Sequence, residues 1–232
     1  ALPDRLETAS WACAALATDG DIYVGGAKQQ EMLTFLNVFR KVGGDFDIHE
    51  DGIRFRRGGA LRPVVVETDV HPGFMTDWQQ PLIVALTQAE GVSTVHETVY
   101  ENRLGFTQAL NKMGADIVVH PEGLASPDRR VPRRALEQAA VITGPTPLHA
   151  ADVVVPDLRG GYSHVIGPPA AGGTSRVFRR DLIRSGHRKV FVELPGLRAD
   201  LSHVGVAAVP PPPARVRCAG SARGSAARGT GF

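Results

Sequence analysis

The sequence predicts an α/β protein built from repeated helix–strand–helix–strand–strand units, with the helices packed inside and the sheets outside. One observation behind this prediction is that the same order of helical and strand-like patterns occurs twice along the chain. The other is equal spacing: Gly20 and Gly91 each precede a predicted strand, Gly43 and Gly114 each follow a predicted helix, and both pairs are separated by 71 residues. Equal spacing at two landmarks indicates an internal repeat. A unit of two helices and a small sheet buries its helices poorly alone, so we expect the units to pack around a common centre.

The first unit starts with a helix whose apolar residues lie on nearly all sides, which is typical of a buried helix. A chain that opens on such a helix is expected to be a piece of something larger. Further on, Asp51-Gly52 separates two alternating runs and predicts a hairpin. In order, the predicted elements are a helix over 6–18, a strand over 22–24, an amphipathic helix over 31–42, hairpin strands near 46–48 and 53–55, and a strand over 64–66.

The second unit repeats this order, whereas the third is degraded. The second unit is predicted to contain a helix over 78–89, a strand over 94–99, a helix over 104–113 and strands over 117–119, 140–142 and 153–155. A third pass is visible in 174–177 and 197–201, but Gly167-Pro168-Pro169 is predicted to break its helix. From Gly205 onward the chain has no acidic residue and contains a run of prolines. We therefore expect two intact units over 1–166, a degraded third unit over 167–204 and a disordered tail over 205–232.

The composition is that of an ordinary globular protein, with 232 residues, 43% hydrophobic and 22% charged, and a formal net charge of +2. A charge so near neutral gives no reason to expect nucleic acid or an anionic membrane as a partner. No apolar run approaches the roughly 20 residues that a membrane span needs, and the N-terminal residues lack a signal-peptide pattern. The two cysteines, Cys13 and Cys218, have no metal-type spacing, so neither a metal site nor a disulfide framework is expected. These observations predict a soluble cytoplasmic protein.

The stretch from His71 to Gln80 has the features of a functional site. It joins the predicted strand over 64–66 to an apolar helical run over 82–89, and strand-to-helix junctions gather backbone N–H groups that bind ligands. Its acid, Asp77, has two local interpretations. It is either a helix cap or first-turn acid, or a functional carboxylate.

Five short stretches carry a resemblance to a known family. They are Pro3-Asp4-Arg5, His71-Pro72-Gly73-Phe74 with Thr76-Asp77, Glu97-Thr98-Val99-Tyr100-Glu101-Asn102-Arg103, Met113-Gly114-Ala115 and Asp157-Leu158-Arg159. With them, the chain resembles the enolpyruvyl transferases from residue 1 to about Ile166. It is more similar to the branch that acts on UDP-N-acetylglucosamine than to the branch that acts on shikimate phosphate. The resemblance implies an inside-out α/β barrel of three units, and a first domain of the same enzyme as the partner of this one.

The resemblance also implies a reaction. The enolpyruvyl group of phosphoenolpyruvate moves to the 3-hydroxyl of UDP-N-acetylglucosamine and phosphate leaves, which is the first committed step of peptidoglycan synthesis. No metal and no cofactor are implied. The implied site residues are Asp77 as base and sugar partner, Thr76 beside it, Val99 through its backbone, Asp157 and Arg159 at the interdomain cleft, and Arg5 and Arg103 at the same cleft. For Val99 the alternative is a core residue, and for the last two arginines it is a surface ion pair.

Several features depart from the family pattern and leave other functions open. The reactive loop cysteine and the lysine that contacts phosphoenolpyruvate belong to the domain outside this chain, and Cys13, within an apolar helix, does not replace the cysteine. Ser185 stands where the phosphoenolpyruvate-binding arginine is expected. The alternatives are a catalytically inactive sugar-nucleotide-binding module, another enolpyruvyl transferase such as the shikimate-phosphate enzyme, and a structural domain without a ligand. We expect no measurable turnover from this chain alone.

Overall fold

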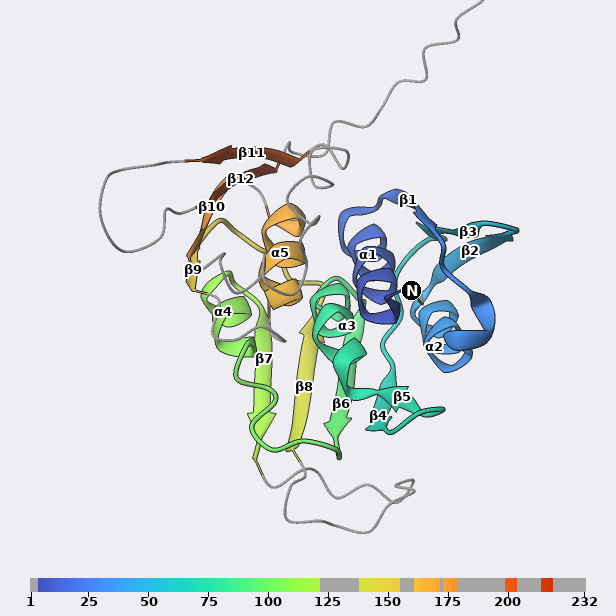
Figure 1. Cartoon of the computed structure of the whole chain (residues 1–232). Helices are drawn as coiled ribbons and strands as arrows, with labels where there is room; N and C mark the ends of the chain where they lie inside the picture. Colours follow the sequence, from blue (N-terminus) through green and yellow to red (C-terminus); the bar gives the residue numbers. More distant parts are fainter. Residues whose placement is uncertain are drawn as a thin grey trace, which may run out of the picture.

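The computed structural model describes residues 4–121, 138–154, 161–171, 173–178, 199–203 and 214–218, which form three sheets and the helices between them (Figure 1). The helices are α1 (Arg5–Thr18), α2 (Leu33–Val42), α3 (Gln79–Leu86), α4 (Thr107–Lys112) and α5 (Gly161–Ala170), with 3₁₀ turns η1 (Gln29–Glu31) and η2 (Thr76–Trp78). The strands are β1 (Asp21–Gly25), β2 (Gly44–His49), β3 (Gly52–Arg57), β4 (Val65–Asp69), β5 (Phe74–Met75), β6 (Gly91–Glu97), β7 (Asp116–His120), β8 (Gln138–Gly144), β9 (Asp152–Val154), β10 (Gly173–Phe178), β11 (Ala199–His203) and β12 (Ala214–Cys218).

The three sheets share one topology, which confirms the predicted repeat. Their strand orders contain β1-β3-β2, β6-β8-β7 and β10-β12-β11, so the third strand of each unit lies in the middle. In every sheet this middle strand pairs antiparallel with both neighbours. Linking strands extend two of the sheets, because β4 pairs parallel with β6 and β9 pairs parallel with β10. The hairpin predicted around Asp51-Gly52 is β2–β3.

The third unit keeps more of this pattern than its sequence predicts. Its middle strand, β12, comes from the segment expected to be disordered, where the structure has a strand over 214–218. A strand pairs through its backbone N–H and C=O groups, and the alternation of arginine with apolar residues in this segment is compatible with a pleated strand. The rest of the expected tail lies outside the described residues.

Helix α5 also differs from the prediction. Gly167-Pro168-Pro169 was expected to break a helix, yet α5 continues to Ala170. Both prolines lie in its last turn, where the missing N–H groups remove only the final intrahelical hydrogen bonds. The helix is held by packing against α1 and α3, and a Cβ added at Gly167 would lie 3.3 Å from Cδ2 of Leu110 on α4. Close packing therefore offsets an unfavourable local sequence.

The helices α1, α3 and α5 pack against one another in the centre, and the sheets lie around them (Figure 1). Every residue of α3 is buried, as are Thr8 to Ala17 of α1. This burial explains why these helices are apolar on all sides. The arrangement confirms the expected barrel with helices inside, although α3 and α4 are shorter than the predicted helices over 78–89 and 104–113.

The repeat landmarks occupy equivalent backbone positions. Asp4 caps α1, because its side chain accepts hydrogen bonds from the backbone N–H groups of Leu6 at 2.8 Å and Glu7 at 3.3 Å. Gly43 ends α2 with a φ of 111°, and Gly114 follows α4 with a φ of 97°. Both values lie in the left-handed region that favours glycine, so the equal spacing in the sequence reflects two equivalent helix ends.

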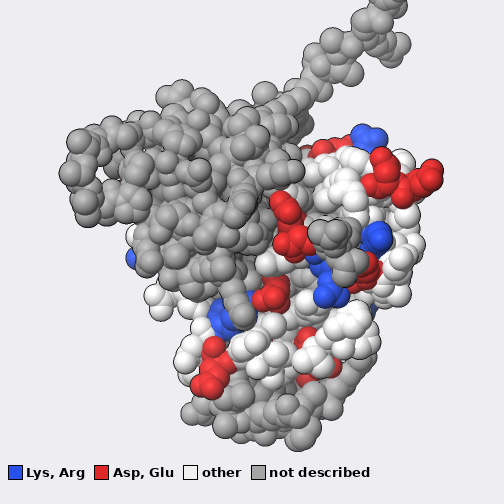
Figure 2. All heavy atoms as spheres, in the orientation of Figure 1, with Lys and Arg blue, Asp and Glu red and all other residues white. Residues whose placement is uncertain are grey.

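The outer face of the first sheet carries cross-strand ion pairs. Arg54 on β3 contacts Asp21 on β1 at 2.7 Å, and Arg56 contacts Asp45 and Asp47 on β2. The arginine partner holds the pKa of Asp21 below its ordinary value, chiefly through the side-chain hydrogen bond. Acidic and basic side chains lie side by side on the face shown in Figure 2, as the near-neutral charge predicts.

Candidate functional site

The stretch singled out in the sequence lies at the carboxyl ends of two parallel strands. β4 and β6 run parallel, and each ends beside a loop that leads toward a helix. Thr98, just after β6, donates its backbone N–H to Oγ1 of Thr68 at 2.9 Å and its hydroxyl to the carbonyl oxygen of Thr68 at 2.5 Å. Carboxyl ends of parallel strands are common positions for ligand sites. The sheet thus fixes the two loops side by side.

An aromatic cluster anchors the turn that carries Asp77. Phe35 of α2, Phe74 of β5 and Trp78 of η2 contact one another with ring centroids 5.5 to 6.3 Å apart. The flanking residues Thr76 and Trp78 are 9% and 1% exposed. Since both neighbours are buried in the protein, the backbone at Asp77 is held in place.

Asp77 forms an ion pair with Arg103, which lies 26 residues further along the chain. The Asp77 side chain is 35% exposed and the Arg103 side chain only 9%. The guanidinium carbon of Arg103 also lies 5.4 Å from the centroid of the Tyr100 ring. Asp77 is not a cap residue, because Met75 and Trp78 hold the cap positions of η2 and α3, but it is the acid in the first turn of η2, as the local interpretation allows. The pair is semi-buried and joins the two loops.

Glu97 is a site residue that the sequence analysis missed. It ends β6, its side chain is fully buried at 0% exposure, and it accepts four hydrogen bonds. Oε2 accepts from the Thr76 hydroxyl at 2.7 Å and from the Gln79 amide. Oε1 accepts from the backbone N–H groups of Val99 at 2.7 Å and Tyr100 at 2.9 Å. The signal in the sequence is an acid inside the predicted strand over 94–99, at the start of the Glu97-to-Arg103 stretch that carries the resemblance.

The structure brings together four of the seven predicted site residues. Thr76, Asp77, Val99 and Arg103 are joined by the hydrogen bonds of Glu97 and by the ion pair. The Thr76 hydroxyl is used within this network rather than exposed to a ligand. The N–H of Val99 is likewise donated to Glu97 and is therefore not available to a ligand.

The other predicted residues stand apart or outside the described chain. Nη1 of Arg5, at the start of α1, lies 3.4 Å from Nδ1 of His71 on the loop before β5. Thr34 of α2 donates its hydroxyl to the carbonyl oxygen of Pro72 at 2.5 Å. These contacts place Arg5 at the edge of the same stretch. Asp157 and Arg159 lie outside the described residues, as does Ser185.

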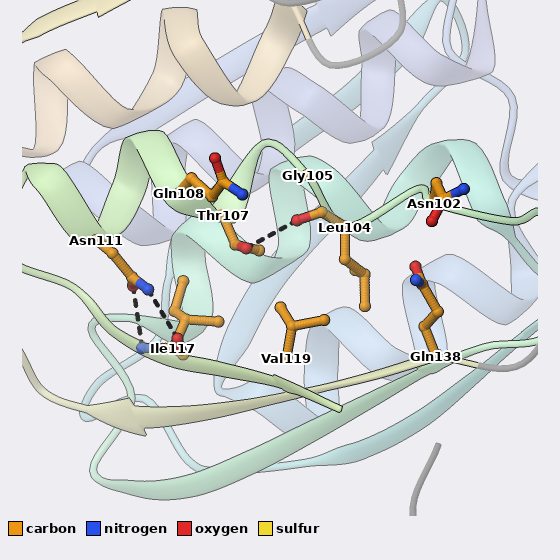
Figure 3. Close-up of a pocket in the computed structure, with 9 residues that line it drawn as sticks. All are labelled: Asn102, Leu104, Gly105, Thr107, Gln108, Asn111, Ile117, Val119 and Gln138. Atoms are coloured by element: carbon orange, nitrogen blue, oxygen red, sulfur yellow. Dashed lines mark hydrogen bonds between the residues drawn. The ribbon is translucent and has the colours of Figure 1, made fainter. Parts of the chain in front are cut away.

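A pocket of about 340 Å³ lies next to the site loop, between the start of α4 and strands β7 and β8 (Figure 3). Its lining comprises Asn102, Leu104, Gly105, Thr107, Gln108, Asn111, Ile117, Val119 and Gln138. The Asn111 amide is occupied by the backbone of Ile117, at 2.8 and 3.1 Å. Gln138 extends toward Asn102, and its Oε1 has no hydrogen-bond partner in the described part of the chain. This lining suits a neutral polar group.

The described residues contain no metal-type cluster, and the thiol of Cys13 is buried. No group of three or more His, Cys, Asp or Glu side chains there is placed to hold a metal ion. Cys13 is completely buried in α1, and desolvation raises the pKa of its thiol far above the ordinary range. Among the helices described, none has the length and apolarity of a membrane span.

The fold and the sequence define the class of this protein. Residues 1–191 match the family described as EPSP synthase (3-phosphoshikimate 1-carboxyvinyltransferase), so the chain belongs to this family of enolpyruvyl transferases. The match extends past Ile166, where the resemblance was expected to end. Among solved structures, the enolpyruvyl transferase NikO from Streptomyces tendae superimposes with a TM-score of 0.75 at 23% identity, covering 89% of this chain and 45% of that one. An EPSP synthase from Acinetobacter baumannii gives 0.59 at 14% identity, over 92% of this chain and 46% of its own. These two likenesses support the fold alone.

Curated relatives narrow the position within the family. A UDP-N-acetylglucosamine 1-carboxyvinyltransferase of Protochlamydia amoebophila is 44% identical over 204 residues, which are 88% of this chain and 44% of the relative. The protein of that name from Chlamydia trachomatis serovar D is 45% identical over 188 residues, 80% of this chain and 42% of the relative. The chain therefore spans less than half the length of these relatives.

Proposed function

We propose that this chain forms part of an enolpyruvyl transferase that acts on UDP-N-acetylglucosamine. The complete enzyme transfers the enolpyruvyl group of phosphoenolpyruvate to the 3-hydroxyl of the sugar and releases phosphate. The observation that carries the proposal is the 44 to 45% identity to relatives of that name, combined with an intact Asp77–Arg103 pair at the strand ends.

In this proposal Asp77 receives the proton of the attacking 3-hydroxyl. Its carboxyl group is partly exposed and so accessible to a ligand, while the Arg103 pair and the buried neighbours fix its direction. A positioned carboxylate is a common general base. The Val99 carbonyl oxygen accepts a hydrogen bond from the sugar nucleotide. Thr76 holds the turn rather than the substrate.

The remaining assignments concern groups that meet in the cleft between two domains. By the resemblance, Asp157 and Arg159 are assigned to the interdomain cleft beside the reactive loop and the phosphate, and Arg5 to the edge of that cleft. Cations are needed there because the carboxylate and the phosphate of phosphoenolpyruvate are negatively charged, and negative charge increases on the phosphate as it leaves. The first domain of the enzyme supplies the reactive loop and a lysine, and closure of the two domains excludes water. The reaction uses no metal and no cofactor.

The proposed reaction implies a biosynthetic pathway and a cellular compartment for the protein. It is the first committed step of peptidoglycan synthesis, which supports cell-wall biogenesis, cell shape and cell division. Its two substrates are small, water-soluble metabolites of the cytoplasm, so we place the protein there. A shikimate-phosphate substrate and an inactive sugar-nucleotide-binding module are the competing functions.

Isothermal titration tests the substrate directly. The chain is titrated with UDP-N-acetylglucosamine and, separately, with 3-phosphoshikimate. We expect heat of binding only with the first, and an Asp77→Asn variant should weaken it about tenfold or more, which is about 1.4 kcal/mol. Asp116→Asn is the matched control, because this exposed acid lies on β7, at the opposite edge of the sheet from β5. Binding of 3-phosphoshikimate instead would move the protein to the other branch, and binding of neither would refute the proposal.

A phosphate-release assay with both substrates separates an enzyme from a binding module. We expect none from the 232-residue chain alone, since it spans less than half of its relatives. Release that disappears in Asp77→Asn would show that the chain is catalytic without its partner domain.

A further inference from the structure

We propose that Glu97 is the positioning residue of this site. Its carboxyl group holds the Thr76–Asp77 turn and the Val99–Arg103 loop at a fixed distance and orientation. The inference rests on the proposed function, because these two segments carry the residues assigned to the sugar nucleotide. Glu97 itself is 0% exposed, so it touches no substrate and acts through its neighbours.

Each oxygen of the Glu97 carboxyl group binds a different one of the two segments. Oε2 faces the turn and accepts from the Thr76 hydroxyl and the Gln79 amide, whereas Oε1 faces the loop and accepts from the backbone amides of Val99 and Tyr100. Three of these four partners are N–H groups that can only donate. One planar group therefore sets the separation of two segments that lie about 20 residues apart in the sequence.

The burial of Glu97 argues for a role beyond filling space. An acidic side chain removed from water is unfavourable unless its oxygens are hydrogen-bonded, and an apolar residue of similar size fills such a position without this penalty. The apolar residue would not, however, bind backbone amides or a hydroxyl. What the carboxyl group adds is a defined geometry between the segments.

The hydrogen bonds act on the atoms that matter for the proposed chemistry. Thr76 directly precedes Asp77, so the hydrogen bond to the Thr76 side chain fixes the backbone from which the Asp77 side chain extends. The N–H bond of Val99 orients that peptide, and with it the Val99 carbonyl oxygen. The Arg103 ion pair then closes a ring from the loop back to Asp77.

Gln79 offers a way to test position apart from charge. Its Nε2 donates to Glu97, while its Oε1 has no hydrogen-bond partner in the described chain. In a Glu97→Gln variant, an amide nitrogen turned toward Val99 and Tyr100 opposes their N–H groups. An amide nitrogen turned toward Gln79 makes the Gln79 amide turn over, which leaves its Nε2 where its Oε1 now lies without a partner. In either orientation a buried donor loses its acceptor. Combining Glu97→Gln with Gln79→Glu exchanges the two groups. The carboxylate at 79 then accepts from the amide at 97, whose oxygen still accepts from the backbone of Val99 and Tyr100.

The experiment measures two quantities for the full chain and its variants. Hydrogen exchange of the Val99 and Tyr100 amides without ligand reports the anchoring, and titration with UDP-N-acetylglucosamine reports its consequence for binding. We expect Glu97→Gln to speed exchange at both amides and to weaken binding about tenfold or more. The exchanged double variant should restore both within about threefold. Glu90→Gln, at the exposed residue just before β6, is the matched control and should change neither.

The outcomes separate this inference from the proposed function. If the wild-type chain binds no UDP-N-acetylglucosamine, the proposed function fails whatever Glu97 does. If wild type binds and Glu97→Gln binds equally well, the positioning role is refuted while the function stands. A double variant that recovers slow exchange but not binding would also refute it, because a charge at position 97 itself would then be required.

Discussion

Two glycines that mark the repeat allow a quantitative test of the fold. Gly43 and Gly114 end equivalent helices at positive φ, but an added Cβ meets different obstacles. At Gly43 it would lie 2.9 Å from the backbone oxygen of Ala60, and at Gly114 it would lie 2.9 Å from the edge of the His149 ring. Alanine at each position therefore combines the same backbone strain with an unequal steric conflict.

The magnitudes follow from what can move. Alanine in a left-handed conformation costs about 1–2 kcal/mol. The His149 side chain is exposed and can rotate away, so Gly114→Ala should cost about that much. The backbone at Ala60 cannot move as freely, because Arg62 donates its N–H to the carbonyl oxygen of Val42 at 2.8 Å. Loss of this bond or the residual overlap adds about 1–2 kcal/mol, so Gly43→Ala should cost about 2–4 kcal/mol.

Urea unfolding followed by the fluorescence of the buried Trp11 and Trp78 measures both values. Gly105→Ala is the control, since a Cβ there meets nothing within 4 Å and the φ is not in the left-handed region. It should leave stability within about 0.5 kcal/mol of wild type. The reasoning is refuted if Gly114→Ala costs as much as Gly43→Ala, or if the control costs as much as either.

Three further predictions concern the ends of the barrel and its surface. Removing residues 204–232 should lower the urea midpoint of unfolding, because it deletes β12, the middle strand of the third sheet. Removing residues 219–232 should leave the midpoint unchanged. Equal midpoints for the two truncated chains would contradict the β12 pairing. Iodoacetamide should label Cys13, read by peptide mass spectrometry, only after unfolding, since the thiol is buried and its pKa is raised. Asp21→Asn should cost about 0.2–1 kcal/mol near neutral pH, because the pair with Arg54 is exposed. The folded-state pKa of this acid is lowered, so the loss should vanish as the pH falls through that pKa, and a constant loss in acid-titrated melts would contradict the assignment.

The sequence predicts the repeated parts of this fold well and the junctions less well. Equal glycine spacing and the Asp51-Gly52 turn reflect local backbone requirements, so the first two sheets follow from them. The third sheet does not follow from such local requirements, because β12 is specified by pairing with β10 and β11 rather than by its own composition. For the same reason α5 persists through two prolines: contacts with α1 and α3, which no local pattern records, outweigh the local preference.

At the site, the sequence identified the partly exposed acid, Asp77, and missed the buried one, Glu97. Asp77 is easily noticed because it lies in a turn, where polar residues often have a function, whereas Glu97 is the last residue of β6 and resembles an ordinary strand end. Only the pairing of β4 with β6 brings the two segments together, and that contact is non-local. A carboxyl group with no exposure and four donors nevertheless restricts the geometry more than an exposed one can, since each of its bonds fixes a different piece of backbone or side chain. The direction of Asp77 is therefore a property of Glu97 as much as of its own turn, and a substitution at either position should disturb the same binding step.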